Sequence, residues 1–164
     1  MSSDGVILRS AGRPGDLGWI VERHGSLYAS EYGWDISFEG LVAGIVAGFA
    51  AAHDPEREAG WIAELDGRRV GSVLCSAEDE PGVAALRTLI VDPSARGRGI
   101  GRSLVERCLE FARGAGYERI VLWTTKDLVA ARRIYDAAGF QVASEYDEER
   151  WGASITSVRM ALDL

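Results

Sequence analysis

The sequence predicts an α/β (α+β) fold in which a mixed sheet is covered on both faces by helices. Short segments with strand character and longer segments with apolar residues at helical spacing follow one another along the chain. The 164 residues are 47% hydrophobic, which is enough for a sizeable core. We therefore expect a single domain over residues 1–164, without a linker or an internal repeat.

The first part of the chain is predicted to hold one short strand and two helices. The strand covers residues 6–9, and a helix opens at Pro14-Gly15-Asp16 and closes at His24-Gly25. Residues 26–35 are dense in aromatic side chains and carboxylates but lack a long helical period, which indicates a substrate-side loop or a broken helix. A longer amphipathic helix is expected from Asp35 to about Ala52.

The middle of the chain is predicted to form a hairpin followed by a central strand. Asp66-Gly67 stands between two alternating runs, residues 61–65 and 69–75, and this dipeptide favours the primed turns that match strand twist. A polar turn at residues 78–82 then leads into an apolar strand at residues 84–91.

The last part of the chain alternates helices and strands. Apolar residues at helical spacing predict a helix from Ile100 to Gly114 or Gly116 and another from Leu128 to Ala138. The remaining segments are expected to be strands at 119–123, 140–146 and 157–163, with a solvated turn at 147–150.

The loop after the central strand is rich in arginine and glycine. Its residues of these two types are Arg96, Gly97, Arg98, Gly99, Gly101 and Arg102. The unpaired amides of a first helical turn bind anions, and glycine lets a phosphate approach the main chain. The 18 basic and 25 acidic residues give the chain a net charge of −7, so a local excess of arginine is unexpected as background. The loop therefore predicts a pyrophosphate site.

The spacing of this loop excludes a Walker A motif and argues against a dinucleotide fingerprint. A Walker A loop requires Gly-Lys-Ser/Thr after four intervening residues, but Arg102 stands in the Lys position behind a different glycine interval. A dinucleotide fingerprint requires G-x-G-x-x-G directly after a strand, whereas these glycines occur at every second residue after a proline turn.

Composition narrows the class of ligand and the compartment. The acidic balance argues against a general nucleic-acid or anionic-membrane binder and suits a cationic or amine substrate. Cys75 and Cys108 fall at apolar positions without metal spacing, and we expect buried free thiols in a reducing compartment. His24 and His53 have no ligand partner at metal spacing, so no metal site is predicted. With neither a signal peptide nor a membrane span recognisable, we expect a cytoplasmic protein.

Three stretches of the sequence resemble the GCN5-related N-acetyltransferase (GNAT) superfamily. Arg96, Gly99 and Gly101 match its [Gln/Arg]-x-x-Gly-x-[Gly/Ala] motif. Residues 128–140 resemble the second motif, Asn-x-x-Ala-x-x-x-Tyr followed by Gly-Phe, although Leu128 stands in the Asn position. Residues 24–35 are similar to acetyltransferase domains fused behind MarR-type regulators, although we expect no DNA-binding half within residues 1–164. The resemblance covers nearly the whole chain.

This resemblance implies a GNAT fold, acetyl-CoA as the cofactor and a primary amine of a small molecule or peptide as the acceptor. The sheet would be mostly antiparallel, with six to seven strands, and splayed between the fourth and fifth. The pantetheine arm would lie along the central strand and the pyrophosphate on the glycine loop. The implied cofactor-binding residues are Leu89, Ile90, Val91, Arg96, Gly97, Arg98, Gly99, Ile100, Gly101, Arg102 and Ser103. The contact of the missing Asn is lost or is supplied by a neighbour such as Asp127.

The resemblance also assigns part of the chemistry. Tyr135 matches the family tyrosine that approaches the CoA sulfur and protonates the leaving thiolate, as a phenol at that place can. A neutral amine would attack the thioester directly, and a backbone N–H of the central strand would stabilise the oxyanion. That strand carries no carboxylate, so the general base stays open. Glu31 is the first candidate, followed by Asp35, Glu39 and a water chain through Thr88.

The aromatic stretch indicates where the acceptor binds. Tyr28, Tyr32 and Trp34, with Glu31 and Asp35 beside them in sequence, predict an aromatic and acidic pocket for a cationic amine, the alternative being a satellite core cluster.

Three further expectations concern the acceptor site, the function and the assembly. Trp151 is another acceptor-site candidate, since the adjoining hairpin borders the acceptor in related folds. A rival function is a non-catalytic acyl-CoA sensor or partner-binding module, which the missing carboxylate and Leu128 leave open. Homodimerisation is common in the resembling family, although no stretch of this sequence demonstrates it.

Overall fold

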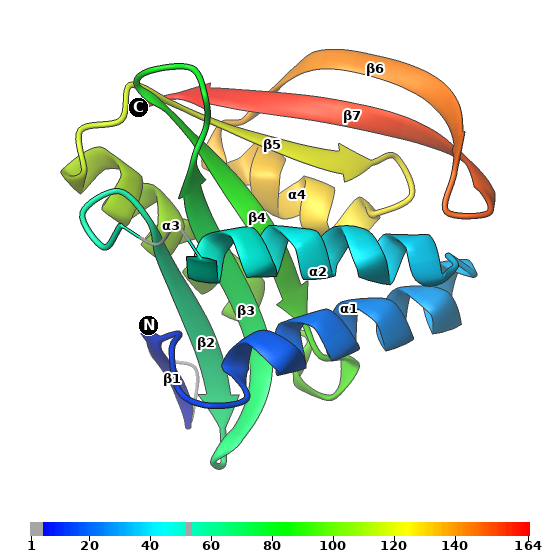
Figure 1. Ribbon diagram of the computed structural model, residues 1–164, viewed down its shortest axis with the longest axis horizontal. Coiled ribbons are helices and arrows are strands. Elements are labelled where there is room, and N and C mark those ends of the chain that lie inside the picture. The colour runs from blue at the N-terminus through cyan, green and yellow to red at the C-terminus, as the bar shows by residue number, and fades with distance from the viewer. Residues whose placement is uncertain (1–4, 52–53) are drawn as a thin grey trace.

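The computed structural model describes residues 5–51 and 54–164 and contains a seven-stranded sheet (Figure 1). The strands, in sheet order, are β1 (Val6–Ser10), β2 (Ala59–Leu65), β3 (Arg68–Ala77), β4 (Val83–Val91), β5 (Arg119–Thr125), β7 (Ala153–Asp163) and β6 (Gln141–Arg150). Neighbouring strands are antiparallel except β4 and β5, which are parallel. The predicted mixed, mostly antiparallel sheet is confirmed. Ala52, the predicted last residue of the second helix, and His53 lie outside the described residues.

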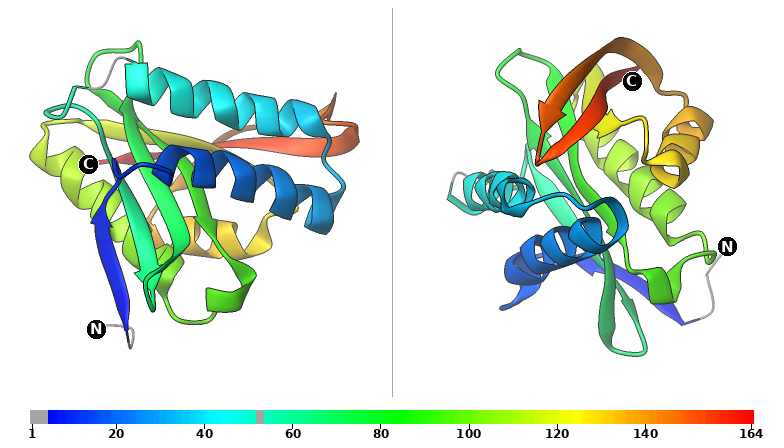
Figure 2. Two further views of the ribbon diagram at one scale, coloured as in Figure 1. Left: turned by 60° about the horizontal axis from the view of Figure 1, so that its bottom comes forward. Right: turned by 90° about the vertical axis from the view of Figure 1, so that its right-hand side faces the viewer.

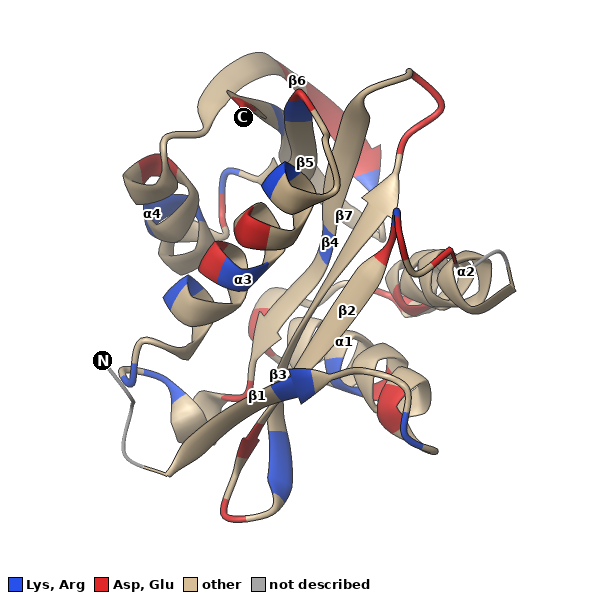
Figure 3. Cartoon of the chain, turned by 90° about the vertical axis from the view of Figure 1, so that its left-hand side faces the viewer, with Lys and Arg blue, Asp and Glu red and all other residues tan. Residues whose placement is uncertain are grey.

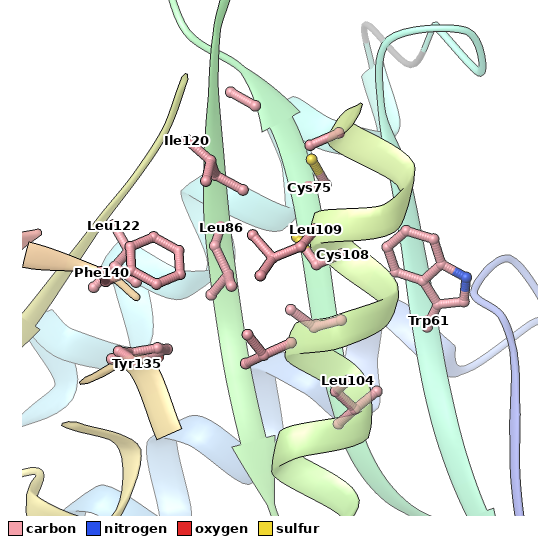
Figure 4. Packing of buried hydrophobic residues seen from close by; sticks show 14 of the residues in the cluster. Trp61, Cys75, Leu86, Leu104, Cys108, Leu109, Ile120, Leu122, Tyr135 and Phe140 are labelled. Atoms are coloured by element: carbon pink, nitrogen blue, oxygen red, sulfur yellow. The ribbon is translucent and has the colours of Figure 1, made fainter. Parts of the chain in front are cut away.

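Helices cover both faces of this sheet, as predicted. The helical elements are α1 (Asp16–Tyr32), α2 (Ile36–Ala51), η1 (Pro93–Ala95), α3 (Ile100–Gly114) and α4 (Val129–Ala138). The right-hand view of Figure 2 shows α1 and α2 on one side of the sheet and α3 and α4 on the other. The larger core cluster lies under α3 and includes Leu104, Cys108 and Tyr135 (Figure 4). A second cluster around Ile20 and Phe38 lies under α1 and α2.

The prediction that the first helix closes at His24-Gly25 is wrong. Helix α1 continues to Tyr32 and ends at Gly33, which has a φ of 71° and whose N–H donates to the carbonyl of Ala29. Gly25 lies inside the helix because α2 approaches it closely: a Cβ at this position would overlap the Glu39 carboxylate. A glycine at this position lets α1 and α2 come into contact without ending α1. Residues 26–32 are therefore helical and do not form a loop.

The predicted turn at residues 147–150 is also wrong. These residues belong to β6, which pairs with β7 as far as Arg150 and Ala153. The turn is Trp151-Gly152, with φ angles of 56° and 74°. Strand β6 is an exposed edge strand, where an acidic run stays in contact with water. We attribute the error to charge, which indicates exposure and does not distinguish an edge strand from a turn.

The parallel strands β4 and β5 separate after three paired residues. Their pairing covers Val83–Ala85 of β4 and Arg119–Val121 of β5. Farther along β4, Thr88 and Leu89 together oppose a single β3 residue, which forms a bulge, and Thr88 adopts a φ of 52°. The Ser72 hydroxyl donates to the Thr88 carbonyl over 2.8 Å. The predicted splay is thus present, and it leaves one edge of β4 without a strand neighbour.

A buried carboxylate joins the start of α1 to the sheet. Asp16 has 0% exposure and accepts hydrogen bonds from the guanidinium groups of Arg9 and Arg69, each at 2.8 Å. The backbone N–H groups of Gly12 and Arg13 donate to it at 2.9 and 2.8 Å. Burial raises the pKa of Asp16, but the hydrogen bonds, that of Arg9 first, outweigh burial and hold the pKa well below its usual range.

We expect Asp16→Asn to lower the free energy of unfolding by about 3 kcal/mol or more, because two guanidinium groups lose their buried partner. Equilibrium unfolding in urea at pH 7 measures this loss. Asp163→Asn is the matched control, since Asp163 pairs with Arg119 at 2.9 Å on the surface and its side chain is 81% exposed. That control should change stability by no more than about 0.5 kcal/mol. Equal losses in the two variants would contradict the assignment.

Candidate functional site

The glycine loop borders a cavity of about 330 Å³, here called the loop cavity, which reaches β4, α1 and the start of α4. Nine predicted cofactor-binding residues line it: Leu89, Ile90, Val91, Arg96, Gly97, Gly99, Ile100, Gly101 and Arg102. The other three, Arg98, Ser103 and Asp127, are not among the lining residues, whereas Leu128 is. Most of the predicted cofactor-binding residues thus line one cavity.

The loop carries backbone amides that make no hydrogen bond within the first turn of α3. Gly97 and Gly99 have φ angles of 80° and 75°, a region that favours glycine. The first helical hydrogen bond of α3 runs from the N–H of Ser103 to the Gly99 carbonyl, at 3.0 Å. The N–H groups that come before Ser103 therefore have no carbonyl partner within the helix. Gly101 is small for a different reason, because a Cβ there would lie 2.7 Å from Ile134 of α4. The loop therefore combines free amides with the positive end of a helix dipole.

An ion pair ties this loop to α1. The Arg96 guanidinium donates to Glu31 Oε1 at 2.8 Å, and both residues line the loop cavity. Glu31, the first candidate for the general base, thus lies beside the loop. Asp35 accepts hydrogen bonds from Ser37 at the start of α2, and Glu39 lies against Gly25; neither lines a described cavity.

A second cavity, of about 320 Å³, opens where β4 and β5 diverge, and we call it the splay cavity. Three of the five predicted acceptor residues line it, namely Tyr28, Trp34 and Trp151. The rings of Trp34 and Trp151 lie 4.5 Å apart, so the tip of the β6–β7 hairpin contacts the α1–α2 connection (Figure 1). Tyr32 lines the loop cavity instead, and Asp35 lines neither.

The charge of the splay cavity differs from the prediction. An aromatic and acidic pocket was expected, but its charged lining residues within the described chain are Arg87 and Arg150. Both arginines, along with His24 and Trp123 of the same wall, were not among the predicted site residues. The available signal was their position: Arg87 interrupts an apolar strand, and Trp123 is the last residue of the apolar run that begins at Ile120.

The two cavities adjoin at the predicted acid. Tyr28, Leu89, Leu128 and Ala131 line both, and Tyr135 lines the splay cavity close by. Tyr135 is 5% exposed and packs edge-on against Phe140, with ring centroids 5.8 Å apart (Figure 4). Burial, followed by the neighbouring Tyr28, raises the pKa of Tyr135, so its hydroxyl stays protonated at neutral pH and can donate.

His24 is a buried, neutral member of the splay cavity and not a helix end. It is 3% exposed, and its Nδ1 lies 2.7 Å from the Ile20 carbonyl, beside the rings of Tyr28 and Phe38. Burial outweighs this hydrogen bond and lowers the pKa of His24 to about 4. At pH 7 the imidazole is therefore neutral, and Nδ1–H donates to the carbonyl.

The described surface carries charges of both signs. Figure 3 shows acidic and basic segments interleaved along α3. Within residues 5–51 and 54–164, no three His, Cys, Asp or Glu side chains are grouped so that they could hold a metal ion. No described helix combines the length and apolar character needed to cross a bilayer.

Comparison with known proteins identifies the family. Residues 20–140 match the Acetyltransferase (GNAT) family. The chain belongs to this GNAT family. It is 41% identical over 81 residues to N-acetylaspartate synthetase of Xenopus tropicalis; this match covers 49% of this chain and 30% of that protein. It is 36% identical over 85 residues to human N-acetyltransferase 8B; that match covers 49% of this chain and 37% of the human protein. This GNAT chain thus spans about a third of the length of these relatives.

Solved structures share the GNAT fold over nearly the full length. The structure of yncA from Salmonella typhimurium with its cofactor acetyl-CoA superposes with a TM-score of 0.78, at 20% identity over 98% of this chain and 94% of that one. A ribosomal-protein-alanine N-acetyltransferase from Brucella melitensis gives a TM-score of 0.76 at 18% identity, over 96% and 99%. At such identities the likeness concerns the fold.

We expect protonation of His24 to destabilise the fold as the pH falls. Above pH 6.5 the imidazole is neutral in both states, and between pH 6.5 and 4 the unfolded chain takes up a proton that the folded chain does not. The stability loss over this window is about 3 kcal/mol. Urea unfolding of the wild type and His24→Gln, whose amide can still donate to Ile20, isolates this contribution. Parallel pH profiles for the two proteins would contradict the expectation.

Proposed function

We propose that this protein is an acetyl-CoA-dependent N-acetyltransferase that transfers the acetyl group to a primary amine of a small molecule or peptide by direct attack. One observation carries the proposal: the cavity beside the anion-binding loop adjoins a second cavity that holds Tyr135. Membership of the GNAT family and the names of the relatives, which denote N-acetyl transfer, support it.

The residues present fit acetyl-CoA. The amides of Gly97 to Arg102 would hold the pyrophosphate, and Arg96 would add a guanidinium at the same loop. The open edge of β4, at Leu89 to Val91, would pair with the amides of the pantetheine arm. When bound, acetyl-CoA supplies an acetyl group activated as a thioester.

Tyr135 would act as the general acid. Its buried hydroxyl is protonated at neutral pH, and it would donate this proton to the departing thiolate as negative charge develops there. A backbone N–H on the splayed edge of β4 would stabilise the oxygen of the reacting carbonyl. Glu31 stays a candidate for the general base, although its ion pair with Arg96 favours a role in holding the loop.

Replacing Gly99 by Ala is expected to raise the dissociation constant of acetyl-CoA by roughly tenfold or more, because a side chain strains the loop that carries the free amides. Gly67→Ala is the matched control, since both glycines have a φ of 75° and neither would have another atom within 4 Å of an added Cβ. Both variants should lose about 1 kcal/mol of stability. Isothermal titration calorimetry would show weakened binding for Gly99→Ala alone; no heat of binding with the wild type would overturn the cofactor assignment.

We expect Tyr135→Phe to lower kcat by about a hundredfold, since the departing thiolate loses its proton donor. The dissociation constant of acetyl-CoA should stay unchanged. Release of free thiol, followed with a panel of primary amines, measures the turnover. An unchanged kcat would remove the acid assignment. Binding of acetyl-CoA by the wild type without thiol release for any amine would favour the non-catalytic sensor.

Several narrower features are also part of this proposal. We place the protein in the cytoplasm, supported by the free and buried Cys75 and Cys108, which a reducing compartment keeps as thiols. The proposal also includes a single domain over residues 1–164 and a homodimer. Residues 24–35 support a kinship with MarR-fused acetyltransferase domains.

A further inference from the structure

The wall of the splay cavity carries positive charge on an aromatic surface. Arg87 lies on β4 and Arg150 at the end of β6, beside the rings of Trp123 and Trp151. Each arginine stacks on one of these rings, with its guanidinium carbon 4.7 Å from the ring centroid. A guanidinium stacked by its face keeps its N–H edge free for an anion. This arrangement therefore presents donors next to apolar walls.

The carboxylates of this GNAT chain leave much of that charge uncompensated. One N–H of Arg87 donates to Glu78 at 3.0 Å. Arg150, and Arg159 on the other side of Trp123 at 5.7 Å, form no ion pair within the described residues. Arg150 thus lines the cavity without an ion pair in the described chain, and in a protein with an excess of seven acidic side chains an unpaired arginine there needs a reason.

The acidic residues of β6 are engaged elsewhere. Their partners are Lys126 for Glu145, Thr156 for Asp147, Ser157 for Glu148 and Ser154 for Glu149. Ser157 lines the cavity and donates to Glu148 at 2.5 Å. Glu148 is not itself among the lining residues, whereas Arg87 and Arg150 are.

Three buried hydroxyls add polar groups to the same wall. The Oγ1 atoms of Thr88, Thr124 and Thr125 are buried and have no hydrogen-bond partner in the described part of the chain. All three residues line the splay cavity, and Thr124 and Thr125 are 8% and 3% exposed. Buried hydroxyls are nearly always paired, so these three have unused hydrogen-bonding capacity beside the cavity.

We propose that the acceptor is a primary amine that carries a carboxylate on an apolar body, such as an amino acid with an aromatic side chain. Arg87 and Arg150 bind the carboxylate, the rings of Trp34, Trp123 and Trp151 hold the apolar body, and the amine faces the junction with the loop cavity. This inference rests on the proposed function, because it names the substrate class of that same site. It also replaces the cationic acceptor that the sequence predicted.

Turnover of matched amines tests the inference. L-phenylalanine, L-phenylalaninamide and 2-phenylethylamine share a ring and an amine, but only the first has a carboxylate. We expect a KM for L-phenylalanine roughly tenfold or more below the KM for either analogue. Arg87→Gln and Arg150→Gln should each raise that KM about tenfold and so narrow the difference in KM between L-phenylalanine and the two analogues. The control is Arg68→Gln, an exposed arginine at the β2–β3 turn. Equal KM values for the three amines would overturn the proposal while acetyl transfer stands.

A binding measurement decides the inference even if no amine is acetylated. Quenching of tryptophan fluorescence reports on the cavity, because three tryptophans line it. With CoA present, N-acetyl-L-phenylalanine should bind about tenfold more tightly than N-acetyl-L-phenylalaninamide, and Arg150→Gln should abolish the difference. Arg150 is exposed, so this variant is expected to fold, which its melting temperature checks. Equal binding of the two probes by the wild type would refute carboxylate recognition, whereas absent thiol release with carboxylate-dependent binding would refute acetyl transfer alone.

Discussion

The separation of β4 from β5 is the constraint on which both cavities depend. A parallel pair normally continues along its length, but here pairing stops after Ala85, and the bulge at Thr88 turns β4 away from β5. A threonine at a φ of 52° is a strained residue, held in place by the hydrogen bond from Ser72. The opening leaves backbone groups of β4 unpaired that a continuous sheet would hydrogen-bond, next to the core cluster under α3 (Figure 4).

Local chemistry made much of the fold predictable. Asp66-Gly67 forms the expected primed turn, with φ angles of 52° and 75°, and Gly139 ends α4 in the left-handed conformation. The glycine loop is recognisable from sequence because its parts are adjacent: a strand, a glycine-rich turn and a helix start follow one another. Such features depend on residues that are neighbours in the sequence, so they can be predicted from the sequence alone.

Features that depend on distant segments were not predictable in this way. In the sequence, Gly25 looks like a glycine that ends a helix. The close approach of Glu39 from α2 explains why it lies inside α1 instead. The positive charge of the splay cavity comes from Arg87 of β4 and Arg150 of β6, which are 63 residues apart in the sequence and line one cavity only in the folded chain. Glu31 and Asp35, adjacent to the aromatic residues in sequence, face other partners once α1 is a continuous helix.

The positive wall and the missing carboxylate belong to one argument. An amine attacks only in its neutral form, and an enzyme can obtain that form by removing a proton or by making the ammonium unfavourable. In the proposed reaction, Arg87 and Arg150 would lower the pKa of a bound ammonium, because like charges disfavour each other, and burial among aromatic rings acts in the same direction. The arginines that bind a carboxylate would then also favour the nucleophile. A carboxylate base close to the amine would oppose this effect by stabilising the ammonium, so its absence from the lining of the splay cavity is consistent with the cavity's charge.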